Sequence, residues 1–228
     1  MRAVLCDIEG TTTDIRFVQD MLFPYAAARI PSWIAGNAAR PEVSAEIAAV
    51  QAETGARTLG EVASTLLGWM AEDRKATQLK AIQGLVWEEG YREGLLRAHV
   101  YPDVAPALAS WRALGLKLGV YSSGSIHAQK LLFGHTITGD LRPQFDAWFD
   151  TTTGPKREPG SYRKIADALA LEPAGILFLS DVVAELDAAA GAGMRTCLIL
   201  RDGLVPSGGH PTATSFFEIE VGTAIVRR

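Results

Sequence analysis

Short apolar runs alternate with amphipathic stretches along most of the chain. Runs about one strand long, bounded by turn residues, recur at residues 3–6, 116–121, 147–149, 176–179 and 196–200. Helix-like stretches lie between most of them. Apolar strands that alternate with amphipathic helices are typical of a parallel sheet covered on both faces. The pattern therefore predicts an α/β fold with a Rossmann-like parallel sheet core.

Turn and capping residues predict where the helices of this core begin and end. Asp103 is expected to cap a helix that Gly115 stops, and Ser161 is expected to cap a helix over residues 162–171. A third helix, rich in alanine, is expected over residues 183–192. Each predicted helix adjoins a predicted strand, as the alternating pattern requires.

Residues 15–96 break this alternation, because they show helical spacing of apolar side chains and no strand pattern. Residues 59–70, for example, place Leu, Val, Leu and Met on one helix face. This stretch is much longer than a crossover between neighbouring strands needs. We therefore expect a helical cap domain, residues 15–96, inserted after the first strand of a core formed by residues 1–14 and 97–228.

Composition and charge narrow the classes of function. The chain has 228 residues, a formal net charge of −4 and no cluster of Lys and Arg. Nucleic acid is not an expected partner, because binding its backbone requires a basic face. The apolar runs are too short to span a bilayer, and the N-terminal segment has no apolar region of a secretion signal. Cys6 and Cys197 lie in apolar runs, so we expect buried thiols, no disulfide framework and a cytoplasmic protein.

Polar clusters follow four of the predicted strands, at the edge of a parallel sheet where ligands bind. Asp7 and Glu9 come directly after the first strand and precede a glycine and three threonines. One carboxylate can attack phosphorus to form an aspartyl-phosphate, and the other can transfer a proton to the leaving oxygen. Taken alone, such a pair of acids is more often an ordinary solvated turn.

The other three clusters offer an anion cradle, a positive charge and a second metal ligand. Ser122 and Ser123 follow the second strand, where hydroxyl and backbone N–H groups at a helix start can hold an anion. Lys156 can neutralise a phosphoryl group and keep the nucleophile ionised. Asp181 gives a hard cation such as Mg²⁺ a second carboxylate. Each cluster alone has a structural explanation, but their common place at strand ends predicts a Mg²⁺-dependent phosphatase of a small phosphorylated metabolite.

Together these motifs resemble those of the haloacid dehalogenase-like hydrolase superfamily, and the resemblance covers the whole chain. Residues 7–13 (DIEGTTT), the serine pair, residues 154–158 (GPKRE) and residues 179–182 (LSDV) are similar to the motifs of its enolase-phosphatase family, also called acireductone synthase. One departure is Asp14, which stands where proline is expected in that family's opening run.

The resemblance implies a two-step enzyme of methionine salvage. Such an enzyme enolises 2,3-diketo-5-methylthiopentyl-1-phosphate and then removes the phosphate, leaving the acireductone 1,2-dihydroxy-3-keto-5-methylthiopentene. A monomer is also implied. The implied site residues are Asp7, Glu9 and Asp181 for Mg²⁺, Ser122, Ser123 and Lys156 for substrate, and Asp7, Glu9 and Lys156 for catalysis. Glu9 could bind the metal through its side chain or through its backbone carbonyl, and the carbonyl would leave the carboxylate available for proton transfer.

Three other interpretations remain open. The chain could be another Mg²⁺-dependent phosphatase of the same superfamily that acts on a different small metabolite. A metal-free dehalogenase is a second alternative, but Glu9 and Asp181 would then have no function. A catalytically inactive phosphate-binding module is a third alternative. Such a module would not need Asp7, Glu9, Lys156 and Asp181 together. The sequence has no zinc-ligand spacing, no Walker-type loop and no G-x-S-x-G elbow, which disfavours other hydrolase and nucleotide-dependent classes.

Overall fold

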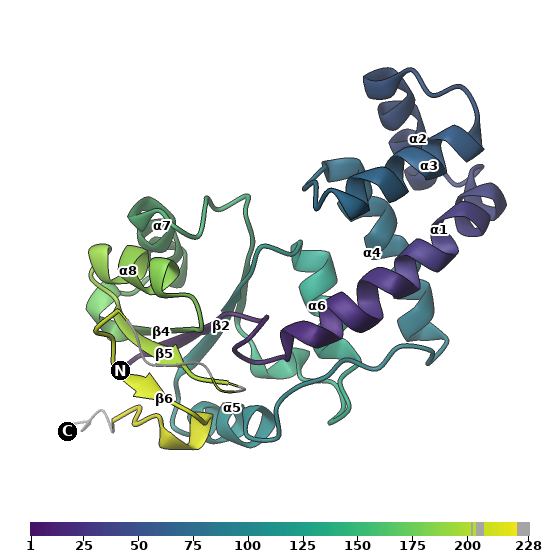
Figure 1. Cartoon of the computed structure of the whole chain (residues 1–228). Helices are drawn as coiled ribbons and strands as arrows, with labels where there is room; N and C mark the ends of the chain where they lie inside the picture. The colour runs from purple at the N-terminus through teal and green to yellow at the C-terminus, as the bar shows by residue number, and fades with distance from the viewer. Residues whose placement is uncertain (202, 204–207, 223–228) are drawn as a thin grey trace. The chain divides into compact units, whose positions relative to one another are not determined.

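The computed structural model describes residues 1–201, 203 and 208–222. Contacts divide the chain into two compact units, one formed by Met1–Ile15 with Ala98–Arg228 and the other by Arg16–Arg97. Figure 1 shows a sheet with flanking helices in the first unit and helices in the second. The predicted α/β core is therefore confirmed. The role of the helical stretch as a cap domain stays a prediction.

Within the described residues, the sheet has six parallel strands in the order β3-β2-β1-β4-β5-β6. Cys6 at the end of one strand pairs with Val120 on one side and with Leu179 on the other. The residues that follow these three strands are consequently neighbours at one edge of the sheet. The strands are β1 Ala3–Cys6, β2 Lys117–Tyr121, β3 Ala147–Phe149, β4 Ile176–Ser180, β5 Arg195–Ile199 and β6 Thr212–Ala213.

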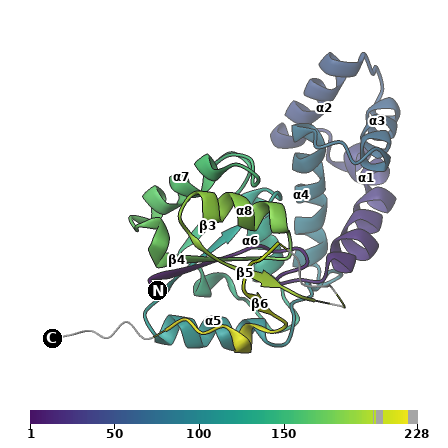
Figure 2. The same ribbon diagram turned by 60° about the vertical axis from the view of Figure 1, so that its left-hand side comes forward.

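Helices cover both faces of this sheet. In Figures 1 and 2, α7 and α8 lie together on one face and α5 lies on the opposite face. The helices of this unit are α5 Val104–Ala113, α6 Ile126–Gly134, α7 Pro159–Leu169 and α8 Val183–Gly191, with short 3₁₀ turns at Arg142–Gln144, Pro173–Gly175 and Phe216–Glu218.

Neither predicted helix cap makes the expected hydrogen bond. Asp103 occupies the N-cap position of α5, as predicted, but its carboxylate accepts a hydrogen bond from the backbone N–H of Phe216 at 2.6 Å and makes no capping bond. Ser161 lies inside α7, which begins at Pro159, and its hydroxyl donates to the carbonyl of Pro155 at 2.8 Å. Both side chains satisfy backbone groups outside their own helices, and a local sequence pattern does not reveal such partners.

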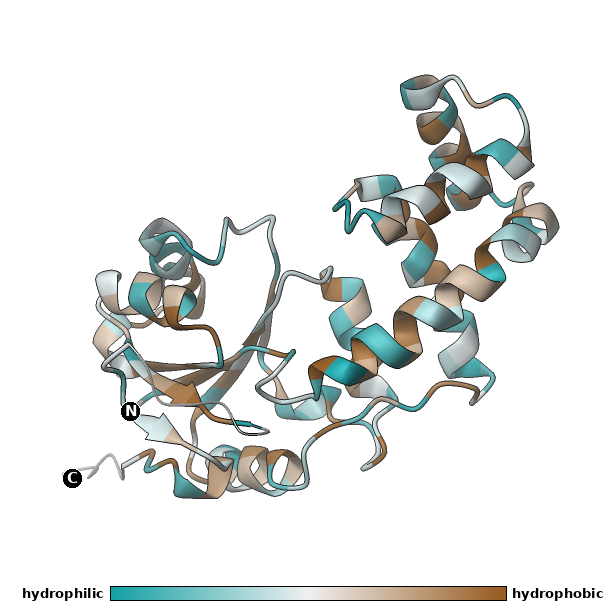
Figure 3. Cartoon of the chain, in the orientation of Figure 1, coloured by the Kyte–Doolittle hydropathy of each residue, from teal (hydrophilic) through white to brown (hydrophobic). Residues whose placement is uncertain are grey.

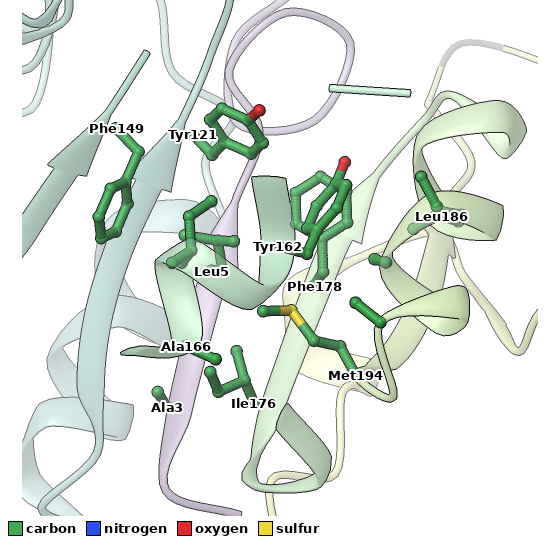
Figure 4. Packing of buried hydrophobic residues seen from close by; sticks show 14 of the residues in the cluster. Ala3, Leu5, Tyr121, Phe149, Tyr162, Ala166, Ile176, Phe178, Leu186 and Met194 are labelled. Carbon is green, nitrogen blue, oxygen red and sulfur yellow. The ribbon is translucent and has the colours of Figure 1, made fainter. Parts of the chain in front are cut away.

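The main core of this unit lies between the sheet and helices α7 and α8. Figure 3 shows apolar residues gathered along the strands, and Figure 4 shows how the buried side chains pack. The rings of Tyr121 and Tyr162 meet edge to face at a centroid distance of 5.5 Å, and Phe178 lies 5.1 Å from Tyr162. Cys6 and Cys197 are buried free thiols, as predicted.

The second unit consists of a π-helix, η1 Phe17–Leu22, followed by α1 Phe23–Asn37, α2 Pro41–Thr54, α3 Leu59–Ala71 and α4 Thr77–Arg92. Two indole N–H groups link its helices. Trp87 donates to the carbonyl of Leu22 at 2.9 Å, and Trp33 donates to the carboxylate of Glu89 at 2.6 Å. Across the whole described part of the chain, no helix combines the length and the apolar character needed to cross a membrane.

The start of α3 offers a test of local stability. The Thr58 hydroxyl accepts a hydrogen bond from the Glu61 N–H, and the Glu61 carboxylate accepts one from the Thr58 N–H. Replacing Thr58 by Ala should lower the free energy of unfolding by about 1 kcal/mol, measured by urea denaturation. Thr77→Ala is the matched control, because Thr77 follows the N-cap of α4, and it should change that free energy by less than about 0.5 kcal/mol. Equal losses in both variants would contradict the capping role.

Candidate active site

A tight loop after β1 presents Asp7 at the carboxyl edge of the sheet. Its backbone N–H donates to the carbonyl of Leu179 at 2.9 Å, which extends the pairing with β4 by one residue. The N–H groups of residues 11–13 reach the carbonyl of Ile8 at 3.2, 2.9 and 2.9 Å. The Thr12 hydroxyl lies 3.2 Å from the Asp7 carbonyl. The loop therefore closes on itself and holds the backbone of Asp7 in place.

Lys156 brings a buried positive charge to this carboxylate. Its Nζ lies 2.6 Å from Asp7 Oδ1 and 2.6 Å from Glu185 Oε2, and the lysine side chain is only 7% exposed. The Ser180 hydroxyl donates to the same Glu185 oxygen at 3.1 Å. One cation thus faces two carboxylates in a site largely removed from water.

These charges shift the pKa values of the buried groups. Burial alone would lower the pKa of Lys156, but the attraction of Asp7 and Glu185 outweighs burial and raises it, so the ammonium stays charged. Burial and the negative charge of Asp7 raise the pKa of Glu185, although Lys156 opposes that shift. A single positive charge does not fully compensate the two acids.

Two core tyrosines hold the loop that carries this lysine. Tyr121 donates its hydroxyl proton to the carbonyl of Gly154 at 2.8 Å, and Tyr162 donates to the carbonyl of Lys156 at 2.7 Å. Figure 4 shows both hydroxyls at the same end of the packed cluster. Gly154 has a φ of 148°, and a Cβ there would lie 2.2 Å from the Ser161 hydroxyl, so the loop requires glycine at this position.

Asp181 follows β4 and lies against the Asp7 loop. Gly10 has a φ of 71°, and a Cβ there would lie 2.1 Å from Asp181 Oδ2, so only glycine allows the loop to approach this carboxylate. Burial, followed by the negative charge of Asp7 and to a smaller extent of Glu9, raises the pKa of Asp181 to about 6. Its Oδ1 is buried and has no hydrogen-bond partner among the residues that the structure describes.

This donor set suits a hard divalent cation. Asp7 and Asp181 offer carboxylate oxygens in one place, and the buried unpaired oxygen of Asp181 is an acceptor that a cation would satisfy. In the part of the chain that the structure describes, no three His, Cys, Asp or Glu side chains form a metal-binding group. Glu9 has an exposed side chain.

Ser122 and Ser123 lie just beyond β2, the neighbour of β1. The Ser122 N–H donates to the carbonyl of Phe149 at 3.2 Å, and the Ser122 hydroxyl accepts from the Gly124 N–H at 3.2 Å. Ser122 is buried, whereas Ser123 is exposed. Helix α6 begins shortly afterwards with Ser125 as its N-cap, so the pair stands at a helix start on the same sheet edge as Asp7.

The structure therefore joins Asp7 and Lys156 directly, places Asp181 against the Asp7 loop, and leaves the serine pair at the adjacent strand end. Sequence reasoning did not select Glu185 as a site residue, although it contacts Lys156. The available signal was its spacing, because Glu185 follows Asp181 by four residues and lies in the first turn of α8.

The chain is similar to known proteins along nearly its whole length. A family model described as haloacid dehalogenase-like hydrolase matches residues 1–193. The chain is 56% identical to Enolase-phosphatase E1 of Pseudomonas aeruginosa (strain UCBPP-PA14), over 97% of this chain and 99% of that protein. It is 54% identical to Enolase-phosphatase E1 of Azotobacter vinelandii, over 96% of this chain and 97% of that protein. The crystal structure of the UTR4 protein from Saccharomyces cerevisiae matches with a TM-score of 0.83 at 33% identity, covering 95% of this chain and 99% of that one.

The charge balance of the site makes a prediction about stability. Lys156→Met would leave two buried carboxylates without their shared cation, so the free energy of unfolding should fall by about 3 to 5 kcal/mol in urea denaturation at neutral pH. Adding Glu185→Gln should restore part of that loss, because it removes one of the two charges. Lys130→Met changes an exposed lysine of α6 and should alter stability by less than about 0.5 kcal/mol. A double variant no more stable than Lys156→Met would refute the shared-cation explanation.

Proposed function

We propose that this protein, which belongs to the haloacid dehalogenase-like hydrolase family and within it to the enolase-phosphatases, converts 2,3-diketo-5-methylthiopentyl-1-phosphate to the acireductone 1,2-dihydroxy-3-keto-5-methylthiopentene and phosphate. The family model and the two relatives confirm the resemblance drawn from the motifs, and they confirm the prediction of a phosphatase. The observation that carries the proposal is the 2.6 Å contact between Lys156 Nζ and Asp7 Oδ1 at the strand edge of a chain more than half identical to enolase-phosphatases.

In the proposed second step, Asp7 is the nucleophile. Its carboxylate attacks phosphorus, a bond forms from Asp7 to phosphorus, and the bond from phosphorus to the leaving oxygen breaks. Lys156 lies against the attacking carboxylate and offsets negative charge on the phosphoryl oxygens during transfer. The closed loop after β1 supports this role, because a nucleophile with a fixed backbone approaches phosphorus along one line.

Glu9 is the proposed acid and base of this step. Its carboxylic acid gives a proton to the departing oxygen, and its carboxylate then takes a proton from the water that attacks the aspartyl-phosphate. Phosphate is released and Asp7 is regenerated. The exposed position of Glu9, two residues after the nucleophile in a closed loop, suits exchange of protons with water.

The proposed cofactor is Mg²⁺, held by the carboxylates of Asp7 and Asp181 and by the backbone carbonyl of Glu9. When bound, it supplies Lewis-acid polarisation of the substrate's oxygens and neutralises phosphoryl charge. Gly10 supports the assignment, because its lack of a side chain lets the Asp7 loop and the Asp181 carboxylate come together.

Ser122 and Ser123 are proposed to bind the substrate phosphate together with Lys156. Their place at the start of α6 supports this, since backbone N–H groups at a helix start attract anions. The proposal also includes residues 15–96 as the cap domain, a small phosphorylated metabolite as the only partner, a monomeric state and a cytoplasmic location in methionine salvage.

The proposed reaction is tested with its own substrate. Supplied with the diketo phosphate and Mg²⁺, the protein should produce first enol absorbance and then free phosphate. Chelation of Mg²⁺ should suppress phosphate release at least about a hundredfold, because phosphoryl charge would then lack its main counter-ion. If neither signal appears while an aryl phosphate is hydrolysed, the substrate assignment is wrong and the phosphatase class stands.

The role of Asp7 is tested by an almost isosteric change. Asp7→Asn should lower phosphate release at least about a thousandfold, because an amide is a poor nucleophile towards phosphorus. Circular dichroism should show an unchanged fold. Asp167→Asn, an exposed aspartate on α7, is the matched control and should keep wild-type turnover. Residual turnover of Asp7→Asn near the control's value would remove Asp7 from its proposed role.

A further inference from the structure

Gln129 is a buried polar side chain that the chemistry proposed above does not use. It lies in α6 and is only 1% exposed. Its Nε2 donates two hydrogen bonds, to the carbonyl of Gly124 at 2.8 Å and to the carbonyl of Phe149 at 2.8 Å. Since both partners are carbonyl oxygens, the NH₂ end of the amide must face them.

This amide carries a cost in stability beside its two hydrogen bonds. Its Oε1 is buried and has no hydrogen-bond partner among the described residues. A buried polar atom without a partner costs free energy. The Phe149 carbonyl already accepts the N–H of Ser122, so it does not depend on Gln129 for pairing. The amide therefore serves to hold in place the backbone whose carbonyls it binds.

That segment sets the direction of one further N–H group. The Gly124 carbonyl is held towards the buried amide, and in a trans peptide the N–H of Ser125 points the opposite way. Two of the next donors are engaged elsewhere. The Ile126 N–H donates to the Asp150 carboxylate at 3.2 Å, and the Ala128 N–H donates to the Ser125 hydroxyl at 3.2 Å. The Ser125 N–H is thus turned away from the core at the start of α6, where the helix dipole favours an anion.

We propose that Gln129 is a positioning residue for the phosphoryl group. By holding residues 122–125 in one conformation, it directs the Ser125 N–H at a phosphoryl oxygen, beside the contacts made by Ser122 and Ser123. The inference rests on the proposed function, because it uses the phosphate-binding role of the serine pair. A backbone N–H recognises the oxygens of a phosphate ester and those of inorganic phosphate alike.

Two substitutions of Gln129 test this role. Gln129→Met keeps the length of the side chain without its donors, and Gln129→Glu sets a carboxylate against two carbonyl oxygens. Both should raise the KM for an aryl phosphate and the inhibition constant of inorganic phosphate by about tenfold, the effect of losing one hydrogen bond to a charged group. The kcat should change less than about threefold, because Asp7 and Lys156 are untouched.

Ile176→Val is the matched control for lost stability. Ile176 is buried at the first position of β4, the end of the strand away from Asp181. This variant should lower the thermal midpoint while leaving inhibition by phosphate unchanged. If both Gln129 variants keep phosphate inhibition within twofold of wild type, Gln129 has only a structural role and the proposal is wrong.

A measurement on the unmodified protein does not depend on how the variants fold. In the ¹⁵N-labelled protein with Mg²⁺, inorganic phosphate should shift the amide resonance of Ser125 along with those of Ser122 and Ser123. A Ser125 resonance that stays in place while phosphate inhibits would overturn the proposal. Neither assay uses the diketo phosphate. A wrong substrate assignment would therefore appear as failure of the wild type to turn that compound over, separately from these results.

Discussion

The ammonium group of Lys156 lies between two buried carboxylates, and the rest of the site follows from that charge balance. In a poorly hydrated interior, Asp7 and Glu185 would repel each other strongly without it. With it, one negative charge still exceeds the positive charge, and Asp181 adds another nearby. A site with this surplus favours a divalent cation, and the ammonium together with such a cation favours a phosphoryl dianion. The same arrangement therefore links the charge balance around Asp7 to the class of reaction.

The sheet brings these groups together because its strands are parallel and β1 is central. The parallel sheet could be predicted from the sequence, whereas the central place of β1 comes from the structure. β1 and β3 were predicted to the residue, because each is a continuous apolar run between turn residues. β6 was not predicted, since Thr212 and Ala213 form only two residues of strand and carry no apolar run. The order of polar clusters at strand ends placed Asp7 and Lys156 at one edge, and the structure shows their contact.

The side-chain contacts that could not be predicted from the sequence share one physical cause. Asp103, Ser161 and Gln129 are polar residues whose decisive partners are backbone groups outside the local helical pattern. A local pattern reads such residues as helix caps or as ordinary helix positions, because capping partners are always close in sequence. Glu185 was passed over as a site residue for a related reason. Its burial beside Lys156 depends on how α8 packs, which spacing alone does not determine.

Tyr121 and Tyr162 make the position of the Lys156 backbone depend on the packing of the interior. Their rings belong to the packed cluster and their hydroxyls fix the backbone around Lys156. A substitution that shifts either ring by a fraction of an ångström is transmitted to the ammonium group, although no reacting atom has been changed. Fewer substitutions should consequently be tolerated in the core beneath this loop than elsewhere in the core. Core substitutions chosen here to raise thermal stability would also alter turnover.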